Sequence, residues 1–195
     1  MKFDVHVRSI ISRCIGKIRL LFKNVFHLSK ETKLLLYNAL ISPHLNYCDE
    51  VWTHAISSEL VSKLETVQNA AMRFILGIKD LRFPISTMKD QLGWLSLKEK
   101  RNIHYLTMCW LSASDFAGSP AYLREMFQRT SSLHGHNTRT RYHIPRMRTN
   151  MSKTSFKLYG PSLYNRLPLE VRDSPSIEVF RKKILQFIKN NEQFI

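Results

Sequence analysis

The chain has 195 residues, of which 44% are hydrophobic, and its 30 Lys and Arg residues against 15 Asp and Glu residues give a formal net charge of +15. That apolar content can form a core, so the composition excludes a disordered tail. The surplus charge favours a polyanionic partner, because each phosphate that a cation neutralises releases counterions. No apolar run reaches the roughly 18 residues of a membrane-spanning helix, so we expect no membrane partner.

Cysteine usage and the N-terminal segment bear on the compartment. The three cysteines, Cys14, Cys48 and Cys109, each lie in an apolar stretch and form no CxxC pair. An odd, scattered set is not a disulfide framework, so we expect thiols packed in the core of a cytoplasmic or nuclear protein. The basic, amphipathic segment up to Phe26 also resembles a mitochondrial targeting segment, but Asp4 and the continuous helical pattern favour an ordinary helix.

Apolar residues at helical spacing predict a bundle of about three helices in residues 1–79. The first helix is expected over 5–26. The second follows Ser29, a residue type that caps helix N-termini well, and its apolar stripe continues to Trp52 with a kink at Pro43. The third is expected to open at residue 57 or 58 and to end at a glycine, residue 77.

The rest of the chain predicts further helices separated by a basic loop. A weaker helical pattern over 85–92, a longer one over 96–114 and a short one over 120–127 indicate a second helical layer in residues 80–129. Between Phe127 and Leu169 the chain has eight Lys or Arg residues and no acid. We expect a basic loop over residues 130–151 and then a C-terminal helix pair in residues 152–195, which makes the expected fold all-α.

Four blocks of the sequence carry a family resemblance. They read LLLYNALISPHLNYCDEVW (34–52), KLETVQNAAMRFILG (63–77), LGWLSLKEKR (92–101) and SFKLYGPSLYNRLPLEVRDSPSIEVFRKKI (155–184). In this order they resemble the C-terminal region of reverse transcriptases of jockey-like non-LTR retrotransposons. The resemblance covers essentially the whole chain from about Val5 onward.

The last block is the most specific one. The family's pattern there is Phe, Gly-Ala-x-Leu-Trp-Asn-x-Leu-Pro, Ile-Arg, Ser and Phe, and the residues that match it are Phe156, Gly160, Leu163, Tyr164, Asn165, Leu167, Pro168, Arg172, Ser176 and Phe180. Two departures occur, Pro161 for the usual Ala and Tyr164 for the usual Trp. The block is apolar and forms turns, so we expect it to dock the last helices rather than to perform chemistry.

The resemblance implies a thumb-like helical bundle followed by a less understood C-terminal extension, both downstream of a catalytic palm. Polymerases of this family hold two metal ions with an adjacent pair of aspartates and a third Asp. This chain contains no Asp-Asp pair, and it lacks the carboxylate and His cluster of the family's endonuclease. We therefore expect no enzymatic activity, no cofactor and no small-molecule substrate, and the upstream reverse-transcriptase domains become a possible partner.

Charge and resemblance together predict a chain that binds RNA or an RNA/DNA duplex. Sequence readout is not implied, because phosphate contacts position the protein on the nucleic acid but do not distinguish one sequence from another. The expected phosphate contacts from the loop and its flank are Arg139, Arg141, Arg146, Arg148, Lys153 and Lys157, and those from the thumb-like helices are Lys17, Arg19, Lys23, Lys63 and Arg73. Tyr142, His143 and Phe156 are candidates for stacking on unpaired bases. For the loop, the alternative is a solvated basic segment whose arginines cap helix C-termini or pair with the acids of the earlier helices. For the cations of the thumb-like helices, the alternative is a solvated helix face.

Two sets of histidine and cysteine residues raise the question of a metal site, and two other functions are alternatives to nucleic-acid binding. The possible ligand sets are His44, Cys48 and His54, and His134, His136 and His143. Neither has a companion cysteine pair to complete four zinc ligands, so we expect no metal site and place Cys48 on the buried stripe. A helical scaffold that binds protein stays open as an alternative function, and so does a non-functional relic of a mobile element.

Overall fold

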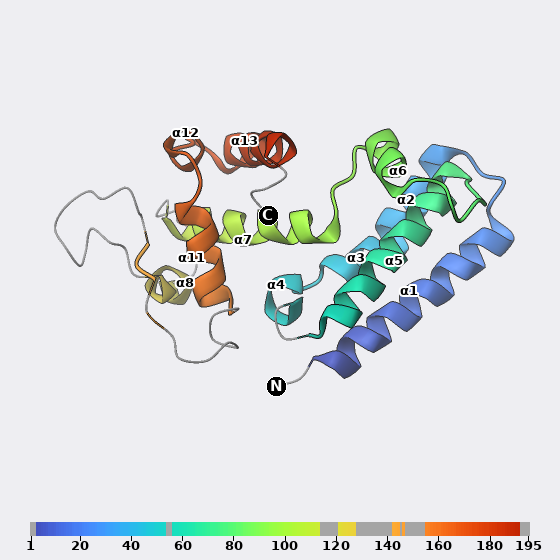
Figure 1. Ribbon diagram of the computed structural model, residues 1–195, viewed down its shortest axis with the longest axis horizontal. Coiled ribbons are helices and arrows are strands. Elements are labelled where there is room, and N and C mark those ends of the chain that lie inside the picture. The colour runs from blue at the N-terminus through green and yellow to red at the C-terminus, as the bar shows by residue number, and fades with distance from the viewer. Residues whose placement is uncertain are drawn as a thin grey trace. The chain divides into compact units, whose positions relative to one another are not determined.

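The computed structural model describes residues 3–53, 56–113, 121–127, 142–144, 146 and 155–191. The regular elements in these ranges are α-helices and none is a strand, which confirms the all-α fold. The chain divides into two compact units, Met1–Leu97 (unit 1) and Lys98–Ile195 (unit 2) (Figure 1). This division falls later than the boundary expected at residue 79, because the helix at 85–92 packs on the long helix of unit 1.

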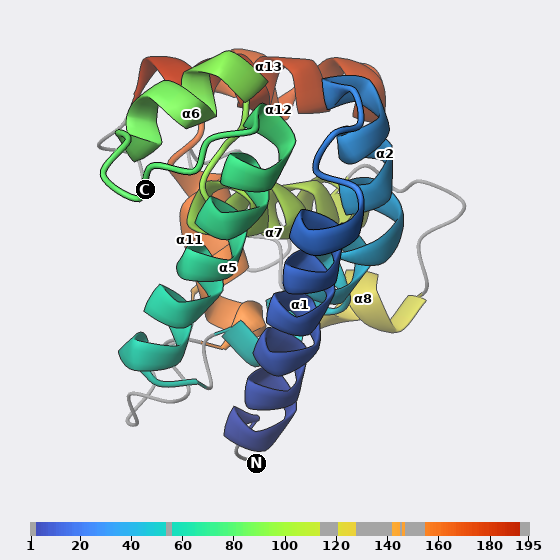
Figure 2. The same cartoon turned by 90° about the vertical axis from the view of Figure 1, so that its right-hand side faces the viewer.

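Unit 1 is a helical bundle built around α1 (Asp4–Asn24) and α5 (Ser58–Leu76). These two helices run side by side in the same direction, α2 (Lys30–Leu40) runs against them, and α6 (Ile85–Leu92) covers the end of α5 (Figures 1 and 2). The apolar stripes predicted for both long helices form the core, whose fully buried members include Val7, Cys14, Leu60, Leu64, Val67, Ala71 and Phe74.

The predicted second helix is divided into three pieces, α2, α3 (Ser42–Asn46) and α4 (Asp49–Trp52). The first break occurs where it was expected, with Pro43 in the first turn of α3. The second break was not expected. Cys48 adopts a left-handed backbone conformation with φ of 49°, which ends the helical register that would have placed its side chain on the stripe. The prediction of a buried Cys48 is therefore wrong, since its side chain is exposed.

The ends of α5 lie where the sequence predicted them. The Ser57 hydroxyl accepts a hydrogen bond from the Leu60 N–H at 3.4 Å. At the other end, Gly77 has φ of 71°, and the N–H groups of Gly77 and Ile78 donate to the carbonyls of Phe74 and Arg73. A glycine is favoured there because a side chain strains a left-handed residue.

A buried cation closes this end of unit 1. Lys33 of α2 is only 6% exposed, and its Nζ lies 4.5 Å from the centroid of the Phe26 ring and 5.7 Å from that of Phe74. The same atom lies 3.8 Å from the point that a Cβ on Gly77 would occupy. Aromatic faces and the negative end of the α5 dipole both favour a positive charge at this position.

Unit 2 consists of α7 (Leu97–Ala113), α8 (Ala121–Met126), α11 (Phe156–Asn165), α12 (Leu169–Arg172) and α13 (Ile177–Asn190). A continuous series of aromatic rings, with centroids 5.4 to 6.3 Å apart, runs through its core. In order of contact the rings are Tyr105, Phe156, Phe127, Tyr142, Tyr164, Phe180 and Trp110. The series joins α7, α11 and α13 to the segment at residue 142.

The most specific block of the sequence packs these C-terminal helices. A Cβ on Gly160 would lie 2.9 Å from Cys109 Sγ, so the glycine lets α11 approach α7 closely. The Asn165 side chain accepts the Tyr142 N–H at 3.1 Å and donates to the Tyr142 carbonyl at 2.8 Å. Ser176 caps α13 by accepting the Val179 N–H at 3.3 Å. Within the described ranges, no helix is long and apolar enough to cross a membrane.

Candidate nucleic-acid interface

The basic loop is only partly within the described residues. Four of the expected phosphate contacts, Arg139, Arg141, Arg148 and Lys153, lie outside them. Three candidates from the loop and its flank are described and are exposed, namely Arg146, His143 and Lys157 at the start of α11. These three side chains face solvent and can reach a ligand.

Tyr142 is buried, and the prediction that its ring stacks on an unpaired base is wrong. Its side chain is 2% exposed, and its hydroxyl donates a hydrogen bond of 2.6 Å to the Cys109 carbonyl. The ring packs between Phe127 and Tyr164, which leaves no face for a base. Phe156 is half-buried and contacts Tyr105 and Phe127. Both rings were assigned from loop composition alone, which gives no information on contacts with distant helices.

Lys17 on α1 is engaged within unit 1. Its Nζ donates to the Leu40 carbonyl at 3.1 Å and lies 2.7 Å from His44 Nε2. This ammonium therefore joins α1 to the break between α2 and α3. Burial, followed by the charges of Lys17 and Arg13, lowers the pKa of His44 below its ordinary value, so the imidazole is neutral at pH 7 and its Nε2 can accept a hydrogen bond from the Lys17 ammonium.

The two candidates on α5 also have partners inside the protein. Lys63 Nζ lies 2.6 Å from Glu59 Oε1 one turn earlier on the helix. Arg73 is half-buried, and its Nη2 donates to the Leu81 carbonyl at 2.9 Å. Lys63 thus has an acidic partner on the surface of α5, whereas Arg73 is held by a neutral carbonyl and keeps its charge.

The outer side of α1 presents two cations with a different character. Arg19 and Lys23 are both exposed and lie one helical turn apart, about 6 Å along the axis. In the described part of the chain neither forms a salt bridge or a hydrogen bond. The one acid on α1 is Asp4, in its first turn and far from them along the helix. This pair is the clearest cationic surface of unit 1.

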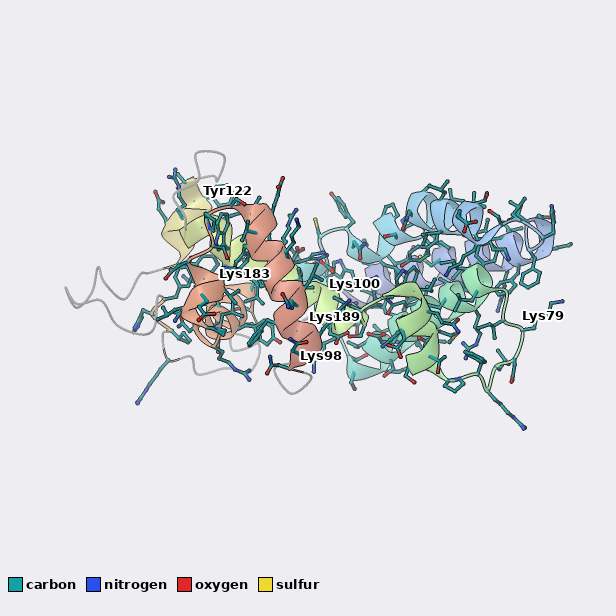
Figure 3. All side chains as sticks on the ribbon, turned by 90° about the horizontal axis from the view of Figure 1, so that it is seen from above. Lys79, Lys98, Lys100, Tyr122, Lys183 and Lys189 are labelled. Atoms are coloured by element: carbon teal, nitrogen blue, oxygen red, sulfur yellow. The ribbon has the colours of Figure 1, made fainter. Side chains whose placement is uncertain are left out.

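Three further exposed cations lie on α13, where the sequence analysis had placed no contact. They are Arg181, Lys182 and Lys189. Figure 3 labels Lys189 and also Lys183, which lies on the same helix. The sequence carries the signal, because the stripe of Phe180, Ile184 and Ile188 defines the buried side of the helix, leaves Lys182 and Lys189 opposite it, and leaves Arg181 at its edge.

The histidine and cysteine sets do not assemble in the described residues. Cys14 and Cys109 are buried as predicted, and burial raises the pKa of the Cys14 thiol to about 11 and raises that of Cys109 as well. Such thiols are poor nucleophiles and poor ligands. His44 Nε2 is already in contact with Lys17, and His54, His134 and His136 lie outside the described residues.

Comparison of the chain with protein-family models, with curated proteins and with solved structures finds no match. The resemblance to reverse transcriptases therefore stays a prediction from the sequence blocks. Evidence on function comes from the chain's own charges and their partners.

Proposed function

We propose that the chain is a non-catalytic protein that binds RNA or an RNA/DNA duplex through the phosphate backbone. The observation that carries this proposal is the state of Arg19 and Lys23, which are exposed and form no ion pair in the described residues. A chain with a net charge of +15 has too few acids to neutralise all of its cations. Binding of such cations to nucleic-acid phosphates is favourable because it releases condensed counterions.

The α1 surface suits backbone contact rather than base reading. The Arg19 guanidinium can bind one phosphate through two parallel hydrogen bonds, and Lys23 supplies a point charge to the next. A helix held by a buried core keeps this spacing fixed. Phosphate contacts position a ligand without reading its sequence, so we expect little preference among sequences.

Catalysis is not part of the proposal. The chain contains no adjacent aspartate pair to hold two metal ions, and nucleotide transfer would need a palm domain from another polypeptide. The resemblance to the thumb of a reverse transcriptase supports a role in holding nucleic acid while such a domain acts.

The test is binding of the purified chain to a labelled single-stranded RNA and to an RNA/DNA duplex across a range of salt concentrations. If about five phosphates are neutralised, log K plotted against log salt should have a slope near about −4. The double variant Arg19→Gln/Lys23→Gln should make that slope shallower by about 1.5. Lys63→Gln is the matched control and should leave it unchanged, because Glu59 already holds that ammonium. Absence of binding, or a slope near zero, would refute the proposal.

A protein-binding scaffold is the second candidate, and one observation favours it. Unit 1 exposes large apolar side chains, with Leu35 69%, Tyr47 71% and Val51 62% exposed. Affinity capture on the immobilised chain with and without nuclease separates the two functions. Partners that survive nuclease treatment would support the scaffold, whereas partners that disappear with it would support nucleic-acid binding.

A further inference from the structure

The C-terminal helix α13 has one side fixed in the core of unit 2. Phe180, Ile184 and Ile188 are fully buried, and the Phe180 ring stacks on Trp110 with centroids 5.4 Å apart. Because successive residues are separated by about 100° around a helix, this anchor determines which residues face solvent. Lys182 and Lys189 are seven residues apart and fall on nearly the same line on the opposite side.

The exposed residues of α13 include three cations and one acid, so positive charge is in excess there. Arg181, Lys182 and Lys189 are exposed and form no salt bridge in the described residues. Glu178 lies one turn before Lys182, yet no ion pair joins these two described side chains. Lys182 and Lys189 are about 10 Å apart along the axis, so they can contact separate phosphates of one strand.

Lys183 on the same helix shows the contrasting behaviour. Its side chain is half-buried, and its Nζ donates a 2.6 Å hydrogen bond to the Glu170 carbonyl at α12. It therefore holds α12 against α13, whereas its neighbour Lys182 has no such task. Two adjacent lysines on one helix thus have different roles, and they form a matched pair for mutagenesis.

The polar character of the exposed side favours nucleic acid over a lipid surface. A helix that lies in a membrane interface needs a broad apolar face to bury among the lipids. The apolar face of α13 is already used by the core of unit 2, and Leu185 is the one large apolar side chain of α13 that is exposed among its described residues. Binding to a phosphate backbone requires only exposed cations at a suitable spacing.

We propose that α13 is a second phosphate-binding surface, carried by Arg181, Lys182 and Lys189, so that the chain binds nucleic acid through both units. This inference rests on the proposed function, because it assigns a further contact to the same kind of ligand. Two modest surfaces on one chain raise the overall affinity, since binding by the first makes binding by the second intramolecular.

The experiment uses the full chain and four variants against the same single-stranded RNA. They are Lys182→Gln/Lys189→Gln, Arg19→Gln/Lys23→Gln, the combination of all four changes, and Lys183→Gln as the control. Between 50 and 200 mM salt, a slope of about −4 corresponds to an affinity loss of about 250-fold. The α13 variant should lose only about 30-fold over that range, and the combined variant less still. Lys183→Gln should melt at a lower temperature and keep the unmodified slope.

The outcomes separate this inference from the proposed function. If the unmodified chain binds RNA and the α1 variant has a shallower slope, but the α13 variant behaves like the unmodified chain, the inference fails and the proposed function stands. If the unmodified chain does not bind RNA, both fail. If the α13 variant keeps RNA binding but loses binding to phosphatidylserine vesicles, α13 is a lipid-binding surface and the inference fails. Far-UV circular dichroism confirms that each variant retains its helices.

Discussion

At the scale of single residues, the helical glycines Gly16 and Gly160 differ in the space around them. A Cβ on Gly160 would lie 2.9 Å from Cys109 Sγ and 3.2 Å from Phe156 Cε2, whereas a Cβ on Gly16 would meet nothing within 4 Å. Neither residue has a positive φ, so packing decides the effect of a side chain at Gly160. Close approach of two helices is the reason for glycine there.

We expect Gly160→Ala to lower the free energy of unfolding by about 1–3 kcal/mol, because the added methyl group overpacks the contact with Cys109. Urea unfolding followed by circular dichroism measures this. Combining it with Cys109→Ala should cost less than the sum of the two single changes, since removal of the sulfur makes room for the methyl group. Strict additivity would show that the close contact is not the cause.

The matched control is Gly16→Ala, which places the same methyl group on the exposed side of α1. It should raise the free energy of unfolding by about 0.5–1 kcal/mol, because alanine loses less conformational freedom than glycine in a helix. Opposite signs at the two glycines would attribute the effect to local space rather than to the residue type.

At the scale of elements, the contact between α1 and the α2–α3 break depends on a neutral histidine. His44 can accept the hydrogen bond from Lys17 only while the imidazole is uncharged, and its pKa is lowered mainly by burial and further by Lys17 and Arg13. The unfolded chain therefore binds the proton more readily than the folded chain. Stability from this contact is present above about pH 6.5 and is lost as the pH falls below that value.

We expect the stability of the unmodified chain to fall more than that of His44→Gln when the pH is lowered from about 7.5 to about 5.5. The glutamine side-chain oxygen can still accept a hydrogen bond from the Lys17 ammonium, but glutamine does not titrate. Thermal melts at a series of pH values measure the difference. In a Lys17→Met background the difference should shrink, because part of the lowering of the pKa comes from that charge. Parallel pH curves for all four proteins would contradict this account.

Helices with strong local signals were predictable from the sequence. The helix over 85–92 and the ends of α5 at Ser57 and Gly77 were placed correctly, since capping residues and apolar periodicity act over a single turn. The break at Cys48 was missed because no glycine or asparagine marks its left-handed conformation. The short helix α12 was missed because four residues carry no periodicity.

The candidate site was less predictable, because exposure depends on partners far along the chain. Arg19 and Lys23 were chosen from the helical pattern, which gives exposure directly. Lys63 and Arg73 were chosen in the same way, but a glutamate and a carbonyl bind them in the fold. Tyr142 lies in a segment without helical periodicity, and its core contacts with Asn165 and the Cys109 carbonyl join residues far apart in the sequence.

At the scale of the whole molecule, the net charge of +15 opposes folding through self-repulsion. Added NaCl screens this repulsion, so the melting temperature should rise between about 20 and 300 mM salt while RNA affinity falls over the same range. Differential scanning fluorimetry measures the first trend. The variant that lacks Arg19, Lys23, Lys182 and Lys189 should show a smaller rise. A melting temperature that is constant or falls with salt would contradict the prediction.

Each unit has its own core and its own exposed cations, so charge is distributed over the chain rather than confined to the acid-free loop. Unit 1 has Arg19 and Lys23 on α1, and unit 2 has Lys182 and Lys189 on α13. Composition predicted the excess of positive charge, but only the structure shows that both units carry exposed cations.

The position of Lys33 affects how chemical footprinting of this protein must be interpreted. Reagents that acylate lysine amines report a bound ligand as protection of the amines beneath it. Phe26 and Phe74 already cover the Lys33 amine in the free chain, so its low reactivity would be the same with and without ligand. Only those lysines that acylate readily in the free protein, such as Lys23 and Lys182, can mark where a ligand lies.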